Sequence, residues 1–417
     1  MTSRSVRILT FTTLYPSSVR PGHGIFVETR LRELLSGGEV EARVVAPVPW
    51  FLSKNARFGE YSFMARTPVR EVHNGIEVEH PRYLSLPKIG MSIAPFLLAL
   101  GSIATIRRLL DDGFEFDLID AHYFYPDGVA AALLSRYFNK PLVVTARGTD
   151  INLIPQYRIP RRLIQWAAKK SRASISVCEA LRDELEGLGV DRSRLLVLRN
   201  GVDLKRFSPL DQAEARSRLS VPAGPTLLSV GYLIERKGHH LAIEALTRLP
   251  QARLLVVGTG PDRSALEALA RRLGVATRVQ FAGSVPQSEL RVHYSAADIL
   301  ILASSREGWA NVLLESMACG TPVVATRVWG TPEVVNSPVA GRLMRERSSD
   351  AIAEAVNDLL ANYPARADVR RHAEQFDWAE TSRGQLKLFK EIARAAGGHT
   401  ACDDASVNRQ AGAEKPQ

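Results

Sequence analysis

Cysteine is scarce in this sequence, which holds only Cys178, Cys319 and Cys402 among its 417 residues. The three have no metal-ligand spacing, and they are too few and too scattered to indicate a disulfide framework. A reducing cytoplasm is therefore the expected compartment. The first residues enter a strand pattern at once, without the apolar stretch and small-residue cleavage site of a secretion signal.

Cofactor signatures are also missing. There is no Asp-x-Asp pair and no His/Cys cluster that would hold a metal ion against a diphosphate, so we expect no metal and no other cofactor. Gly258-Thr259-Gly260 follows a strand pattern, but Arg263 stands where a third glycine would complete a dinucleotide-binding loop. A nicotinamide cofactor is therefore not expected.

The positive charge of the chain is concentrated in its first half. The net charge is +10, and residues 1–208 contain 29 Lys and Arg against 21 Asp and Glu. Such an excess favours an anionic substrate or an anionic membrane surface as partner. Nucleic acid is not expected, because the aromatic residues are not interleaved with the basic ones as in a known binding module.

Strand and helix patterns alternate twice along the chain, from Val6–Thr12 onward and again from Thr226–Val230. This alternation predicts α/β structure with parallel strands crossed over by helices. A polar, proline-containing segment at Lys205–Pro225 separates the two series. We predict two doubly wound domains facing a central cleft, residues 1–204 and 205–379. A helix at 380–396 is expected to pack back on the first domain, followed by a disordered tail at 397–417.

Two segments of the first domain raise the question of membrane contact. Ile89–Ile106 carries no charge, but Gly, Ser and Pro dilute its hydrophobicity, so a buried or interfacial helix is favoured over a membrane span. Arg158–Arg172 is basic and amphipathic. Together the two could lay one face on an anionic bilayer, and a solvated helix face is an equal alternative. Residues 50–85 read as irregular and aromatic.

The stretch Glu307–Thr326 combines acids with a helix start. Glu307 and Glu315 are separated by seven residues, and an apolar helical pattern begins near Asn311. The first amides of such a helix are open donors that favour an anion. Gly320 and Pro322 end the helix before a buried strand. This arrangement suits a polyhydroxylated ligand that bears phosphate.

Other candidate residues follow predicted strands, where α/β sheets bind their ligands. Arg236 and Lys237 lie on a loop between a strand and a helix, where two cations can neutralise a diphosphate; a solvated basic turn is the alternative. Gly22-His23-Gly24 forms a similar loop, and an ordinary strand–helix connection would look the same. His122 follows the strand Phe116–Asp120, in a position that suits either a structural or a catalytic role.

These motifs resemble the retaining glycosyltransferases of family 4, which have the GT-B fold of two Rossmann-like domains. The resemblance covers most of the chain, through DLIDAHYFYPDG, VLRNGVDLKRFSP, SVGYLIERKGHHLAIEAL and EGWANVLLESMACGTPVVAT. LYPSSVRPGHGIFVE is similar to the subset that builds bacterial surface polysaccharides, including teichuronic-acid-type enzymes. This sequence departs from the family pattern at three positions. Tyr232 stands where the family often has Arg, and Arg147 stands where it commonly has His. Ala310 occupies a position that is often Gly or Pro.

The resemblance implies a role for each matching residue. Glu315 would bind the ribose hydroxyls, since a carboxylate matches a vicinal diol, and Glu307 would approach the transferred sugar. Lys237, supported by Arg236, would bind the diphosphate, and His122 would contact the donor sugar. Glu307, His122 and Lys237 are thus the expected catalytic residues. The remaining donor contacts would come from main-chain groups near Gly24, Val285, Asn311, Val312 and Leu313.

The expected reaction is sugar transfer from a nucleotide-diphosphate donor to a glycan or polyprenyl-diphosphate-linked acceptor in bacterial polysaccharide biosynthesis, with retention at the anomeric carbon. The acceptor residues are not predicted. The enzyme would be cytoplasmic, with its basic first half allowing contact with the inner face of the membrane. Two alternatives stay open: a nucleotide-sugar epimerase or phosphorylase on a similar scaffold, and a non-catalytic nucleotide-sugar-binding subunit of a polysaccharide assembly.

Overall fold

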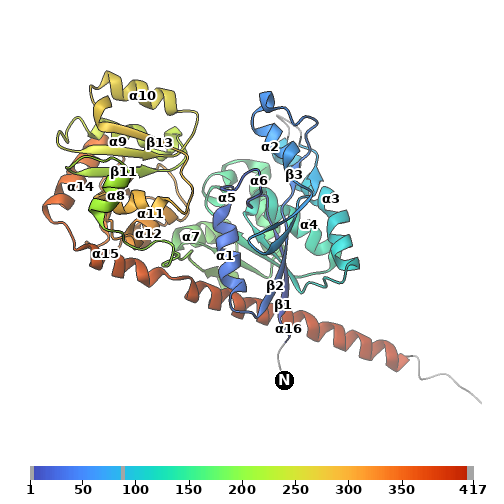
Figure 1. Ribbon diagram of the computed structural model, residues 1–417. Coiled ribbons are helices and arrows are strands. Elements are labelled where there is room, and N and C mark those ends of the chain that lie inside the picture. The colour runs from blue at the N-terminus through green and yellow to red at the C-terminus, as the bar shows by residue number, and fades with distance from the viewer. Residues whose placement is uncertain (1–3, 86–89, 411–417) are drawn as a thin grey trace, which may run out of the picture. The chain divides into compact units, whose positions relative to one another are not determined.

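The chain forms two compact units, seen in the computed structural model in Figure 1, which describes residues 4–85 and 90–410. Unit 1 comprises Met1–Leu198 and Ala379–Gln417, and unit 2 comprises Arg199–Trp378. The boundary between the units thus lies between Leu198 and Arg199, a few residues before the predicted boundary at 204. Hydrogen bonds to unit 2 explain the difference. The Trp309 indole donates to the carbonyl of Asn200 at 3.0 Å, and the Val202 amide donates to that of Phe376 at 2.9 Å, so this loop packs on unit 2.

Unit 1 is built on an eight-stranded sheet in the order β10-β9-β8-β7-β1-β2-β5-β4. All neighbours are parallel except β4 and β5. The central strands read as continuous apolar runs because helices cover both faces of a parallel sheet. The strands are β1 (Val6–Phe11), β2 (Val40–Val45), β4 (Arg70–His73), β5 (Ile76–Glu79), β7 (Leu118–His122), β8 (Leu142–Ala146), β9 (Ala173–Ser176) and β10 (Leu195–Val197).

The segment predicted as irregular, 50–85, is largely structured. It contains β4, β5, a 3-10 turn, a short helix and a strand that pairs with β3 (Val48–Pro49) in a two-stranded ribbon. The period-2 pattern was obscured because these strands are only two to four residues long. The three elements not yet named are η1 (Ala56–Phe58), α2 (Glu60–Arg66) and β6 (Arg82–Tyr83).

The helices of unit 1 connect the parallel strands by crossovers. They are α1 (Ile25–Leu35), α3 (Gly90–Asp111), α4 (Val129–Phe138), α5 (Thr149–Asn152), α6 (Arg158–Lys170) and α7 (Glu179–Gly187). The apolar helix α3 packs on α4 and β6. Its stretch Met91–Asp111 is long and apolar enough to span a membrane by length and composition, and a third of its most apolar window is buried in the protein. Ile89, where the predicted segment begins, lies outside the described residues.

The last helix, α16 (Trp378–Gln410), belongs to unit 1 from Ala379 onward. Phe389 is fully buried in the unit 1 core. Gln385 accepts from Arg30 Nε at 2.8 Å and donates to Asp120 at 3.3 Å. The helix continues to Gln410, where the sequence predicts a disordered tail from 397, and residues 411–417 lie outside the described part of the chain.

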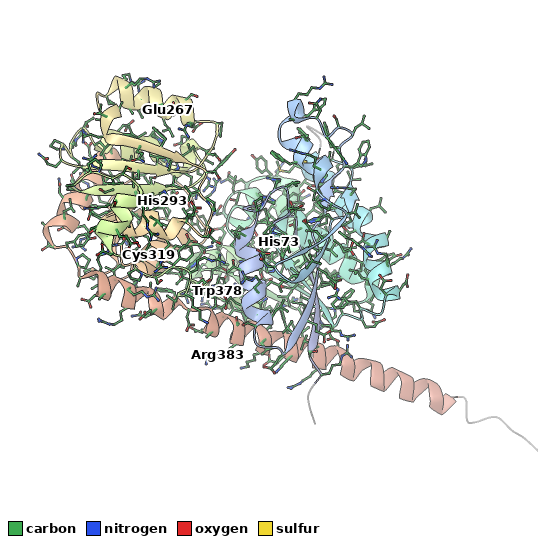
Figure 2. The ribbon with its side chains drawn as sticks, viewed as in Figure 1. His73, Glu267, His293, Cys319, Trp378 and Arg383 are labelled. Atoms are coloured by element: carbon green, nitrogen blue, oxygen red, sulfur yellow. The ribbon has the colours of Figure 1, made fainter. Side chains whose placement is uncertain are left out.

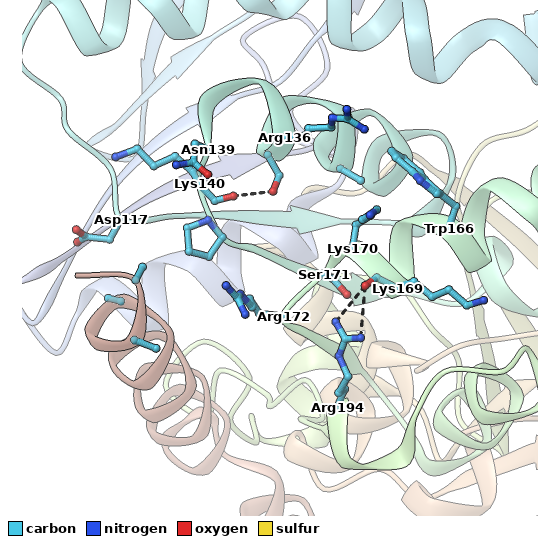
Figure 3. A pocket seen from close by; sticks show the side chains of 16 residues that line it. Asp117, Arg136, Asn139, Lys140, Trp166, Lys169, Lys170, Ser171, Arg172 and Arg194 are labelled. Atoms are coloured by element: carbon cyan, nitrogen blue, oxygen red, sulfur yellow. Dashed lines mark hydrogen bonds between the residues drawn. The ribbon is translucent and has the colours of Figure 1, made fainter. Parts of the chain in front are cut away.

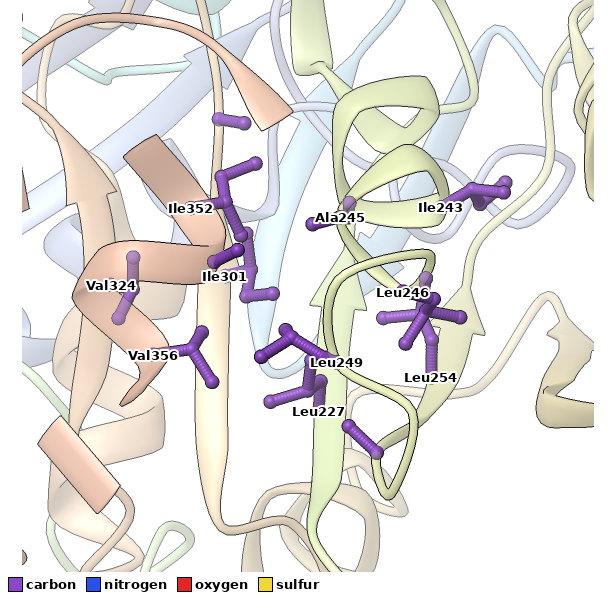
Figure 4. Close-up of a cluster of buried hydrophobic side chains, with 14 of the residues drawn as sticks. Leu227, Ile243, Ala245, Leu246, Leu249, Leu254, Ile301, Val324, Ile352 and Val356 are labelled. Carbon is purple, nitrogen blue, oxygen red and sulfur yellow. The ribbon is translucent and has the colours of Figure 1, made fainter. Parts of the chain in front are cut away.

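Unit 2 has a six-stranded, fully parallel sheet in the order β13-β12-β11-β14-β15-β16. Leu227, Leu254, Ile301 and Val324 lie in its core with side chains from α9 and α14 (Figure 4). The strands are β11 (Thr226–Val230), β12 (Arg253–Val257), β13 (Val279–Gly283), β14 (Ile299–Leu302), β15 (Val323–Thr326) and β16 (Gly341–Met344). The helices are α8 (Gln212–Arg218), α9 (His239–Ala245), α10 (Arg263–Arg272), α11 (Leu290–Ala296), α12 (Asn311–Ala318), α13 (Thr331–Val334), α14 (Ser349–Ala361) and α15 (Arg366–Ala373).

Candidate active site

Lys237 and Glu307 form an ion pair at the carboxyl edge of the unit 2 sheet. Lys237 Nζ lies 2.6 Å from Glu307 Oε1, and Arg236 Nη1 lies 3.9 Å from the same oxygen. Lys237 follows β11 and Glu307 follows β14, and these strands are neighbours in the sheet. The fold therefore brings together two cations and an acid that are 70 residues apart in the chain.

The loop that carries the cations is held tightly against the loop after β14. Gly238 has φ +72°, and a Cβ there would lie 2.1 Å from the carbonyl oxygen of Ala303. The Ser305 amide donates to the carbonyl of Arg236 at 2.8 Å, and the Arg236 guanidinium donates to that of Arg306 at 2.6 Å. Only glycine allows this approach, so Gly238 fixes where Lys237 stands.

Glu315 lies on α12, one turn after the helix start, as predicted. It is 8% exposed, accepts from the Tyr294 hydroxyl at 2.7 Å and is also hydrogen-bonded by the Gln287 side chain. Burial raises the pKa of Glu315, and these hydrogen bonds oppose the rise. Arg206 donates to Gln287 Oε1 at 2.6 Å, so a chain of polar groups orients the carboxylate.

The start of α12 leaves two open amides rather than three. The helix begins at Asn311, as predicted, after Ala310 at φ −87° and ψ 88°. The Leu313 amide is engaged, because it donates to the carbonyl of Ala310 at 3.0 Å. The Leu313 amide is thus engaged within the first turn in this conformation, and its contact with a ligand stays a prediction. Within residues 4–85 and 90–410, no acceptor lies on the amides of Asn311 and Val312.

The glycines of Gly258-Thr259-Gly260 serve packing between loops. A Cβ at Gly258 would lie 1.9 Å from the carbonyl oxygen of Gly231, and one at Gly260 would lie 2.4 Å from that of Leu233. The Leu233 amide also donates to the carbonyl of Thr259 at 2.8 Å. Close contact with the cation-bearing loop thus accounts for a pattern that looks like part of a dinucleotide motif.

In unit 1, His122 ends β7 and is deeply buried. Arg147 Nη2 donates to its Nδ1 at 2.7 Å, and its Nε2 lies 3.2 Å from Asp120 Oδ2. Burial lowers the pKa of His122 to about 4. Both ring nitrogens are therefore occupied in a neutral ring, and a donor-sugar contact through the ring would need this network to rearrange. Arg147, which departs from the family pattern, is the residue that occupies Nδ1.

The glycine-rich loop of unit 1 begins α1. Gly24 has φ +67°, and a Cβ there would lie 2.2 Å from the carbonyl carbon of Leu14. His23 Nε2 is 3.0 Å from the carbonyl oxygen of Thr13, and both residues line a cavity of about 190 Å³ together with His80 and Tyr83. This cavity lies beyond the carboxyl ends of β1 and β2, where α/β sheets bind ligands.

Several polar residues of these sites escaped the sequence analysis. Asp127 accepts from the Thr13 amide at 2.6 Å, Asp150 accepts from the Phe124 amide at 2.8 Å, and burial raises the pKa of Asp127 to about 7. Asp127 and Asp150 each stand directly after a strand and loop, so their position was a usable signal. Tyr294 and Gln287 gave none, because only the fold brings them to Glu315.

The remaining predicted or notable residues are unremarkable. Val285 is half-buried on the loop after β13. Cys319 ends α12 as a buried free thiol whose pKa burial raises to about 12 (Figure 2). In the described part of the chain, no three His, Cys, Asp or Glu side chains are grouped as metal ligands.

Comparison with known proteins relates both units to sugar-transferring enzymes. The model of glycosyltransferase family 4 matches residues 60–206, and that of group 1 glycosyl transferases matches residues 211–376. A Bacillus subtilis protein assigned to teichuronic acid biosynthesis as a glycosyltransferase is 31% identical over 359 residues, which cover 84% of this chain and 88% of that protein.

Solved structures share the fold. Sucrose-phosphate synthase of Thermosynechococcus elongatus superposes with a TM-score of 0.78 at 20% identity, over 94% of this chain and 100% of that one. Anabaena HepE in complex with UDP-glucose gives a TM-score of 0.69 at 20% identity, over 92% and 99%. The chain therefore belongs to the group 1 and family 4 glycosyltransferases and has their GT-B fold.

Proposed function

We propose that the chain transfers a sugar from a nucleotide-diphosphate donor to a glycan or lipid-linked acceptor, with retention at the anomeric carbon. The observation that carries this proposal is the cluster of Lys237, Arg236 and Glu307 on neighbouring strand ends, on the chain segment that also begins α12 and bears Glu315. A Lys ammonium has three donors, so Lys237 can keep Glu307 and still donate to a phosphate oxygen.

Each group has a role in the proposed reaction. Lys237 and Arg236 stabilise the negative charge that develops on the diphosphate as the glycosidic bond breaks, and the Asn311 and Val312 amides add the partial positive charge of a helix start. Glu315, oriented by Tyr294, accepts from the ribose hydroxyls, and Glu307 lies near the transferred sugar. The donor phosphate oxygen takes the acceptor proton, so no separate general base is needed. No metal ion is required in this scheme.

Support for the donor class comes from relatives as well as from this site. HepE was solved with UDP-glucose, and that protein shares this fold. Teichuronic acid biosynthesis, the assignment of the Bacillus relative, is the kind of surface-polysaccharide synthesis we propose here. Gly24, His122 and main-chain groups near Val285 would complete the donor contacts.

The donor is found by screening nucleotide sugars for a rise in the unfolding temperature, because a ligand that binds only the folded state stabilises it. Lipid-linked acceptors are then tested with the best binder. We expect transfer and release of a nucleoside diphosphate. A new nucleotide sugar formed without acceptor would instead identify an epimerase, and donor binding without transfer to any acceptor would identify a binding subunit.

We further propose that unit 1 contacts a membrane from the cytoplasmic side, through side chains beyond the carboxyl ends of β2 and β5. Exposed apolar residues gather in this part of the sequence: Trp50, Leu52, Phe58, Tyr61, Phe63, Leu84, Met91, Phe96 and Leu100. The first turn of α6 adds exposed Ile159 with Arg158, Arg161 and Arg162. Large apolar side chains beside cations suit an anionic bilayer.

Vesicle flotation tests the membrane contact. Leu52 and Leu100 are 83% and 68% exposed, so replacing both with Ser should leave the fold intact. We expect the wild-type protein to float with anionic vesicles and the double variant to float less. Equal flotation of the two proteins would contradict the proposal.

A further inference from the structure

A second basic site lies at the opposite edge of the unit 1 sheet. A pocket of about 880 Å³ opens there, lined by Arg136, Lys140, Lys169, Lys170, Arg172 and Arg194 (Figure 3). Among the residues that the structure describes, Asp117 is the one acidic residue of its lining. The family motifs of the sequence include none of these six cations, and the proposed sugar transfer does not use the pocket.

The topology explains why these residues meet. Asp117, Pro141, Arg172 and Arg194 each stand directly before one of the parallel strands β7, β8, β9 and β10, which are consecutive in the sheet. The last residues of α4 and α6 reach the same edge, because crossover helices run antiparallel to the strands. The pocket thus lies at the amino ends of four strands, whereas substrates of α/β sheets bind at the carboxyl ends.

Helix α6 therefore carries two separate basic groups. Arg158, Arg161 and Arg162 begin the helix at the carboxyl edge, and Lys169 and Lys170 end it in the pocket. The sequence suggested a single basic face from Arg158 to Arg172. The structure divides that face between the two ends of the helix, so the two groups lie at opposite edges of the sheet.

Most of the cations in the pocket have no acidic partner. Lys140 lies 3.5 Å from Glu115, and Arg194 donates to the carbonyl of Lys169 at 3.4 Å. For Arg136, Lys169, Lys170 and Arg172, the part of the chain that the structure describes holds no ion-pair partner. Arg194 contacts only a neutral carbonyl in the described part of the chain, so with these four it makes five positive charges that are available to a ligand.

The positive charge of the pocket exceeds what is needed to neutralise the carboxyl ends of the helices that reach it. The carboxyl ends of α4 and α6 each carry about half a negative charge, so the two together offset about one cation. Asp117 offsets no more than one further cation, and it already accepts from the Arg7 amide at 2.8 Å. About three of the five charges without an acidic partner remain, which calls for a ligand with at least two negative charges.

The remaining lining defines the size and character of that ligand. Trp166 on α6 and Ala393, Ala395 and Ala396 on α16 supply an aromatic wall and a small-residue wall. The volume is within the range of sites that hold whole small molecules, and far exceeds the need of one phosphate. We propose that this pocket binds a ligand bearing two or more phosphate groups, either a soluble phosphorylated compound or the headgroups of anionic lipids.

Calorimetric titration with inorganic tripolyphosphate tests the site on the full chain. All proteins carry Lys237→Ala, which removes the principal phosphate-binding cation proposed for unit 2. One variant adds Lys169→Ala, Lys170→Ala and Arg172→Ala. Its matched control adds Arg158→Ala, Arg161→Ala and Arg162→Ala, which remove the same charge from the other end of α6. Each cation can make a charge-assisted hydrogen bond to a phosphate oxygen, so losing three cations should weaken binding at least about tenfold.

We expect tripolyphosphate to bind the background protein and the control triple variant with similar affinity, and the pocket triple variant at least about tenfold more weakly. Equal weakening in both triple variants, or no weakening in the pocket variant, would overturn the proposal. Flotation with phosphatidylglycerol and with phosphatidylcholine vesicles then separates the sources. Selective loss of phosphatidylglycerol binding in the pocket variant identifies lipid headgroups, and unchanged flotation identifies a soluble ligand. The three pocket substitutions, made in the wild-type protein with Lys237 intact, should leave sugar transfer unchanged, which keeps this result separate from the proposed function.

Discussion

At the scale of single residues, Lys237 is the side chain on which the proposed chemistry depends most. Its ammonium contacts Glu307 and stands on a loop whose position Gly238 fixes. Arg236 is further from the acid, at 3.9 Å, and donates to a main-chain carbonyl. Because its ammonium has three donors, Lys237 can keep Glu307 and still donate to a phosphate oxygen.

Lys237→Ala should lower sugar transfer about 10²–10³-fold, because charge stabilisation of a leaving group by one positioned donor has about this magnitude. The measurement is kcat and KM with the true donor. Lys205→Ala, which removes an exposed lysine of the same unit, is the matched control and should leave both constants unchanged. Unchanged turnover and donor affinity in Lys237→Ala would rule out the diphosphate role.

His122 should make unit 1 less stable in acid. Its pKa is lowered from 6.5 to about 4 by burial, so the unfolded chain binds a proton that the folded chain resists between these pH values. Stability is then lost as pH falls from about 6.5 to about 4, by about 3 kcal/mol for this group. His122→Asn should lose less over the same range.

The readout is the free energy of unfolding in urea at pH 7 and pH 4.5 for both proteins. Asp127, whose pKa is raised to about 7, contributes with the opposite sign. Because Asp127 is present in both proteins, its contribution cancels in the comparison. An identical pH dependence for wild type and His122→Asn would contradict the neutral, buried state of His122.

At the scale of elements, loop positions depend on glycines that the sequence could not rank. Gly238 and Gly274 both have positive φ, +72° and +68°, and both follow or precede helices. Only at Gly238 would a Cβ clash, with Ala303, while nothing lies within 4 Å of one at Gly274. The first loop is therefore fixed by packing and the second only by its backbone conformation.

Gly238→Ala should be much more destabilising than Gly274→Ala. Both variants bear the cost of a left-handed residue, about 1 to 2 kcal/mol, but only Gly238→Ala must also displace the loop that carries Lys237. Thermal unfolding and nucleoside diphosphate titration measure the two effects. If the two variants lose equal stability and Gly238→Ala keeps its affinity, the close contact with Ala303 does not position the cations.

Elements with a clear period or motif were the predictable ones. The start of α12 at Asn311 was predicted because Glu307–Thr326 joins a turn, an apolar helical pattern and a Gly/Pro stop. The short strands β4, β5 and β6 were missed because two to four residues give too little alternation to read. The extension of α16 to Gln410 was missed because the sequence from 397 onward is polar and has no apolar period.

At the scale of the whole molecule, the order of strands and helices predicted two parallel α/β units and their family. Contacts between distant residues were beyond the sequence. Nothing in the chain order indicates that the Tyr294 hydroxyl donates to Glu315, or that Arg147 donates to Nδ1 of His122. Nor does it indicate that Arg136, Lys170 and Arg194 line one pocket. Such groupings arise only when neighbouring strands bring their loops to one edge of a sheet.

The most direct test of the central claim is proton NMR of a transfer reaction with the identified donor and acceptor. Retaining sugar transfer predicts a product with the anomeric configuration of the donor sugar and one nucleoside diphosphate released for each bond formed. A product of inverted configuration would contradict the proposed mechanism, and turnover of the donor to another nucleotide sugar without acceptor would contradict sugar transfer itself.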